Sequence, residues 1–101
     1  ATAATIMPDR ETQGAIWRYL VRQGSTVCET PMSLCRKIVR WSNQPMSLGQ
    51  LMTCLDIFRD VGLLTTVRMH KYLSIRLTPG DTKADLSASR TMQRLLQAKE
   101  S

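Results

Sequence analysis

The side chains of this chain that could hold a metal are few and scattered. His70 is the one histidine, and Cys28, Cys35 and Cys54 form no C-x-x-C pair. A zinc site needs about four ligands at short spacings, so we expect no metal site. Free cysteines that serve as small apolar core residues are typical of a reducing cytoplasm, which predicts a cytoplasmic location.

Residues that could act in acid–base catalysis are equally sparse. Asp56 and Asp60 are spaced i, i+4 on a predicted helix, but no third ligand or histidine lies near them in sequence. We interpret the pair as a solvated helix face. The chain also has no phosphate-binding glycine loop and no nucleophile–base pair. The sequence therefore predicts no catalytic residue and no cofactor in this chain.

Positive charge is the most informative chemical feature. Fourteen Lys and Arg face eight Asp and Glu in 101 residues, for a net charge of +6. This balance favours an anionic partner such as nucleic acid, with a merely solvated basic surface as the alternative. The candidate phosphate-binding residues fall in a predicted second helix, in or beside a predicted hairpin, and in a predicted first helix: Arg36, Lys37, Arg40; Arg68, Lys71, Arg76; Arg18, Arg22.

Three helices are predicted to position these cations. Asp9 can cap the first helix, which runs to Gly24. Thr30 caps the second and Pro31 suits its first position, and the helix ends before Pro45. The third has capping-box spacing in residues 47–50 and a glycine stop at residue 62.

Two strands and a last helix follow. "LLTTVRM" and "YLSIRLT" alternate like strands, with "HK" between them as the tip of a hairpin. A final helix is predicted over residues 86–99. We therefore expect a mainly α fold with a small β-hairpin (α+β), a winged helix-turn-helix with an extra C-terminal helix. Residues 1–8 form a flexible lead-in, 9–78 the winged-helix domain, and 79–101 a linker with the C-terminal helix.

The third helix stands where a recognition helix would, but its residues do not suit base reading. The face predicted to point away from the core carries no Lys or Arg: Gly49, Thr53, Asp56, Ile57 and Asp60. A helix in the major groove normally brings Arg, Lys, Asn or Gln to base edges. Gln50 is the one good base reader, and the capping box already occupies it. We therefore expect phosphate contacts that do not depend on sequence.

Three stretches carry a resemblance to a known family: "IWRYLVRQG", "SLGQLMTCLDIFRDVGLL" and "KADLSASRTMQRLLQAKE". Together they resemble the C-terminal domain of the Gram-positive form of RecJ, the single-stranded-DNA-specific exonuclease, over roughly residues 10–100. The segment "DLSASRTMQRL" is the most telling part. The residues at matching positions are Trp17, Tyr19, Phe58, Gly62, Leu86, Ser89, Gln93 and Arg94.

The resemblance implies a non-catalytic accessory domain of a cytoplasmic DNA repair and recombination enzyme, which degrades single-stranded DNA from the 5′ end. Manganese or magnesium would belong to the catalytic domains of that parent, because "DHH" is absent here. The start without methionine fits a fragment of a longer protein, and removal of an initiator methionine before a small residue would look the same.

The expected partners are DNA, single-stranded by this resemblance, and, through the C-terminal helix, the parent's catalytic domains or a repair protein. A membrane partner is not expected, since no apolar run is long enough to span a bilayer. The alternatives are a stand-alone winged-helix transcription regulator and a pure protein-interaction domain. In the latter, the last helix would meet its partner through Met92, Leu95 and Leu96.

Overall fold

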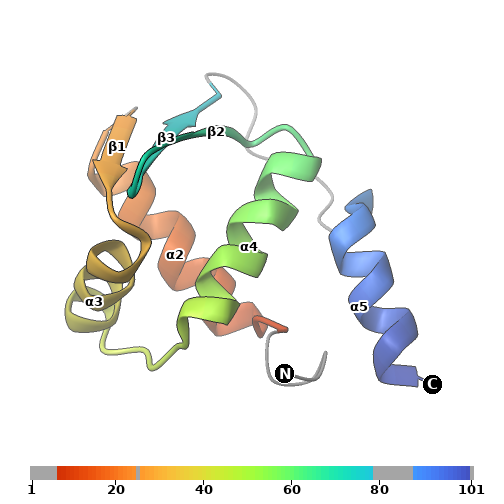
Figure 1. Ribbon diagram of the computed structural model, residues 1–101. Helices are drawn as coiled ribbons and strands as arrows, with labels where there is room; N and C mark the ends of the chain where they lie inside the picture. Colours follow the sequence, from red (N-terminus) through yellow and green to blue (C-terminus); the bar gives the residue numbers. More distant parts are fainter. Residues whose placement is uncertain (1–6, 25, 79–87, 101) are drawn as a thin grey trace.

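Four α-helices and a three-stranded antiparallel sheet make up the part of the chain that the computed structural model describes, residues 7–24, 26–78 and 88–100. The predicted α+β class is therefore confirmed. Figure 1 shows the sheet lying across one side of three helices, with the last helix beside the third of these. The elements are, in chain order, α2 (Arg10–Arg22), β1 (Thr26–Glu29), α3 (Pro31–Ser42), α4 (Leu48–Asp60), β2 (Leu64–Met69), β3 (Tyr72–Leu77) and α5 (Arg90–Glu100).

The first two helices begin at the predicted caps. The Asp9 carboxylate accepts a hydrogen bond of 2.7 Å from the Thr12 backbone N–H, which lowers the pKa of Asp9. Thr30 caps α3 in the same way, and Pro31 takes the first helical position. Asn43 ends α3 with a left-handed backbone, φ 56°. The asparagine, rather than the proline two residues later, supplies this stop.

Both ends of α4 are fixed by local sequence. The Ser47 hydroxyl accepts from the Gln50 N–H, and the Gln50 side chain accepts from the Ser47 N–H, which completes the predicted capping box. At the other end Gly62 has φ 81° and Leu63 N–H donates to Phe58 O at 3.0 Å. This is a Schellman end, in which only glycine takes the left-handed position without strain.

Strand β1 is the element that the sequence analysis missed. It has four residues and pairs antiparallel with β3, placing Val27 opposite Ile75 in a sheet of order β1-β3-β2. Its pairing partner lies nearly fifty residues later, so local pattern alone carried little signal. The predicted hairpin is confirmed, with Met69 opposite Tyr72 and a two-residue turn between them.

The core lies between the sheet and helices α2, α3 and α4. Two aromatic contacts border it: Trp17 meets Phe58 edge-on at 5.5 Å between ring centroids, and Tyr19 meets Trp41 at 5.8 Å. Trp17 packs against the core, whereas Trp41 is partly exposed. The buried cluster is Ile16, Tyr19, Leu20, Val27, Leu34, Ile38, Leu51, Cys54, Leu55, Phe58, Leu63, Leu64, Leu73 and Ile75.

The predicted terminal segments are covered only in part. Most of the lead-in, residues 1–6, and the linker over residues 79–87 lie outside the described residues. The last helix begins at Arg90, and the predicted start at Leu86 also lies outside them. Among the described helices, none combines the length and apolar character needed to cross a bilayer.

Candidate nucleic-acid interface

The outer face of α3 carries the densest group of predicted phosphate-binding residues. Arg36, Lys37 and Arg40 fall at i, i+1 and i+4, and all three are exposed. Together with Ser33 they line a shallow pocket of about 190 Å³, to which no acidic side chain contributes. The spacing of α3 therefore gathers three cations on one side of the helix, as predicted.

Lys37 is tied to the sheet by an ion pair. Its ammonium group donates to the carboxylate of Glu29, the last residue of β1. This hydrogen bond raises the pKa of Lys37, with the negative charge of Glu29 adding to the effect. The contact fixes the first turns of α3 against the end of β1.

The same ion pair lies at the hairpin-tip end of the sheet. Glu29 of β1 is opposite Leu73 of β3, and Leu73 is opposite Arg68 of β2, so the three form one row across the sheet. Neighbouring strands are about 4.8 Å apart, which places the Arg68 backbone roughly 10 Å from Glu29. Lys71 follows in the turn of the hairpin.

Two groups of cations that are distant in sequence therefore lie toward the same end of the sheet, and Arg68 also lines a pocket with Asp56 and Arg59 of α4. We name this surface the basic end and define it as Arg36, Lys37, Arg40, Arg68 and Lys71.

The other three predicted residues lie elsewhere. Arg76 is exposed near the far end of β3, opposite Thr26 and Thr65, and alternation puts it on the sheet face opposite to Arg68. The Arg22 guanidinium lies 5.7 Å from the centre of the Trp41 ring. Arg18 is exposed on α2. The structure thus places five of the eight residues toward the hairpin-tip end of the sheet and leaves Arg76, Arg22 and Arg18 apart.

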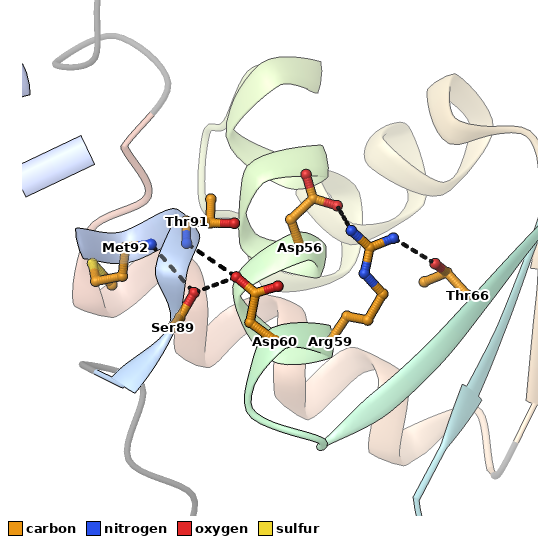
Figure 2. A network of polar contacts seen from close by, with 7 residues as sticks. All are labelled: Asp56, Arg59, Asp60, Thr66, Ser89, Thr91 and Met92. Atoms are coloured by element: carbon orange, nitrogen blue, oxygen red, sulfur yellow. Dashed lines mark hydrogen bonds and ion pairs between the residues drawn. The ribbon is translucent and has the colours of Figure 1, made fainter. Parts of the chain in front are cut away.

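The C-terminal half of α4 is engaged in contacts within the domain. Arg59 bridges Asp56, with 3.3 Å between guanidinium and carboxylate, and the hydroxyl of Thr66 in β2, at 3.4 Å. Figure 2 shows this arginine lying between the two partners. Partial burial nevertheless raises the pKa of Asp56. Asp56 is thus paired with a neighbouring cation, although its side chain keeps 46% exposure on the helix face that was predicted to be solvated.

Asp60 joins α4 to the start of α5. Its carboxylate accepts from the Ser89 hydroxyl at 2.7 Å and from the Thr91 backbone N–H at 3.0 Å. The Ser89 hydroxyl in turn accepts from the Met92 N–H at 3.2 Å, so Ser89 caps α5 (Figure 2). The Ser89 bond, followed by the Thr91 bond, lowers the pKa of Asp60. A carboxylate at a helix N-terminus also complements the helix dipole.

The structure corrects one prediction about α4. Ile57 was placed on the face pointing away from the core, but its side chain is fully buried, at 0% exposure. Asp60, on the same predicted face, is the contact point for α5. Helix α5 packs against α4, and Leu95 is its buried apolar residue. Part of the face that a recognition helix would turn to DNA is therefore covered within the domain.

Two of the three cysteines, Cys54 and Cys35, pack with the core as the sequence analysis expected of apolar residues. Cys54 is fully buried, and this burial raises the pKa of its thiol far above the ordinary value. Cys35 is partly buried and Cys28 is exposed on β1. Within the described residues, no three His, Cys, Asp or Glu side chains come together in a group that could hold a metal ion.

Two residues of this region were not foreseen. Glu29 was not assigned to a strand, so its pairing with Lys37 had no basis in the sequence reading. Ser89 was noted in the "DLSASR" segment, and its position three residues before Met92 is a capping signal that could have been used. The hydrogen bond between Ser89 and Asp60, by contrast, depends on tertiary packing and has no local signal in the sequence.

The chain matches no protein-family model, no curated protein and no solved structure. Function is therefore inferred from the side chains themselves.

Proposed function

We propose that this domain is a variant winged helix-turn-helix that contacts nucleic acid through phosphates, without reading sequence. The element order helix, strand, helix, helix, strand, strand and the sheet order β1-β3-β2 support the fold assignment. In it, β2 and β3 form the wing and α4 occupies the recognition position.

The observation that carries the function is the basic end. Arg36, Lys37 and Arg40 project from α3 at the same end of the sheet as Arg68 and Lys71. Each phosphate that such a cation neutralises releases counterions, so affinity depends on salt and not on base sequence. Helix α4 lacks free base readers among its described residues, because the Gln50 side chain serves the capping box.

The experiment reverses charge on α3 while keeping the Lys37–Glu29 pair intact. The variant is Arg36→Glu with Arg40→Glu, and the matched control is Arg90→Glu with Arg94→Glu on α5, which changes the net charge equally. Loss of two phosphate contacts should weaken binding alike for all sequences and reduce the slope of log K against log salt by about 1.4 for single strands. Equal losses of affinity in the two variants would show that only the net charge of the domain matters for binding.

As an accessory domain, it would hold DNA for catalytic domains elsewhere in a longer protein. The resemblance to the C-terminal domain of Gram-positive RecJ supports this role and a single-stranded DNA substrate. The docking of α5 counts against the alternative of a stand-alone regulator, because α4 would have to enter a groove beside Asp60 and α5. Selection from random duplexes tests this point, and enrichment of one sequence would support the regulator.

A protein-docking role is the second candidate, and one groove favours it. The groove lies between α3 and the start of α4, has a volume of about 720 Å³, and exposes Met32 and Leu48 beside Arg36 and Arg40. The last helix is a weaker candidate than predicted, because Leu95 is buried within the domain. Leu48→Gln separates the two roles without changing charge, since a docking surface would lose its partner while DNA affinity stayed within about twofold.

A further inference from the structure

The hairpin carries an exposed aromatic residue that phosphate contact does not use. Tyr72 is 46% exposed and its cross-strand neighbour Met69 is 51% exposed. Leu73 and Ile75 on the same strand are buried, so alternation directs Tyr72 to the opposite, open face of the sheet. A tyrosine that packed across the hairpin for stability alone would need a covering side chain, but Met69 is itself exposed.

Positive charge lies beside this ring. The Lys71 ammonium lies 5.8 Å from the centre of the Tyr72 ring, and alternation along β3 places Arg76 on the same open face. Residues 67–72 are all exposed and include no carboxylate. An open aromatic surface next to cations is the combination with which proteins bind single strands, the ring stacking on a base and the cations meeting the flanking phosphates.

We propose that Tyr72 is a stacking platform for an unpaired nucleobase, with Lys71 contacting an adjoining phosphate. The inference rests on the proposed phosphate-binding function and adds a preference for single strands. In a duplex, base faces are covered by their neighbours except at the ends, so the platform has a partner only where bases are unstacked. Any base provides such a face, and the site therefore stays indifferent to sequence.

The test compares two single-stranded probes of equal charge, oligothymidylate and an oligonucleotide of abasic sites. Tyr72→Ala should weaken oligothymidylate binding on the order of tenfold and leave abasic binding unchanged. Tyr72→Phe keeps the ring and should retain the affinity. Val67→Ala removes an exposed apolar side chain from the same strand pair without removing a ring, and it should also bind as the parent does.

A fluorescence readout reports stacking directly. Tyr72→Trp should show emission quenched by oligothymidylate and not by the abasic probe, after subtraction of the signal from Trp17 and Trp41 in the parent. Unchanged oligothymidylate affinity in Tyr72→Ala, alongside weakened binding in the α3 charge-reversal variant, would overturn the stacking site and leave the proposed function standing. Failure of the parent to bind either probe at low salt would overturn both.

Discussion

The contact between α4 and α5 gives the sharpest prediction about stability. Ser89 is fully buried, caps α5 through the Met92 N–H, and donates to the Asp60 carboxylate. Ser89→Ala removes the cap and one of the two hydrogen bonds of Asp60. The Thr91 N–H remains as a donor to that carboxylate, so the substitution weakens the contact between α4 and α5 but keeps one of its hydrogen bonds.

The magnitude follows from these contacts. Loss of a serine cap costs about 1 kcal/mol. A hydrogen bond to a charged group contributes about 1.5–3 kcal/mol when buried, but Asp60 is exposed and regains water, so we count less than about 1 kcal/mol for it. The sum is about 1–2 kcal/mol, which in a domain of this size lowers Tm by roughly 5–10 °C. Asp60→Ala should cost a similar amount, and the double variant less than the sum.

Thermal unfolding followed by two signals tests this prediction. Far-UV circular dichroism reports all helices, while tryptophan fluorescence reports α2 and α3, which carry Trp17 and Trp41. If α5 undocks first, ellipticity falls before the fluorescence changes. Gln97→Ala, on the exposed side of α5, is the matched control and should unfold as the parent does. Tm values for Ser89→Ala and Asp60→Ala within about 1 °C of the parent would refute the role of this network.

Further predictions concern the hairpin turn, the thiols and acid stability. His70 has φ 55°, a strained value for a non-glycine residue, so His70→Gly should raise the free energy of unfolding by about 1 kcal/mol in urea titrations; a loss of stability would contradict this. Cys28 should react rapidly with a thiol reagent while the buried Cys54 reacts only on unfolding, which mass spectrometry of the labelled protein checks. The folded-state pKa of Asp60 lies below 3.8, so its stabilisation is present at neutral pH, declines as pH falls below 3.8, and is lost below the folded-state pKa. Asp60→Asn should flatten the pH dependence of Tm in that range. A fall of Tm at acid pH that is the same as in the parent would contradict this role of Asp60.

Local signals were sufficient for the helices and the hairpin. Asp9, Thr30 and the Ser47–Gln50 box each act on the next turn of chain, so their effect could be predicted from spacing alone. The left-handed position at Gly62 is a local requirement of the same kind.

Features that depend on distant contacts could not be predicted in this way. Strand β1 needs its partner β3, and the burial of Ile57 depends on tertiary packing. The eight candidate cations were predicted as exposed residues, but their separation into the basic end and three residues elsewhere was not predicted. The position of Arg68 at the same end of the sheet as α3 follows from the register of the strands. Residue spacing in the sequence does not reveal this register.

The measurement that tests the central proposal most directly is fluorescence anisotropy of labelled single-stranded and duplex oligonucleotides, titrated with the domain at low and at physiological salt. We predict binding that is indifferent to sequence, falls steeply with salt, and is stronger for single strands. No binding at low salt, or binding confined to one duplex sequence, would contradict it.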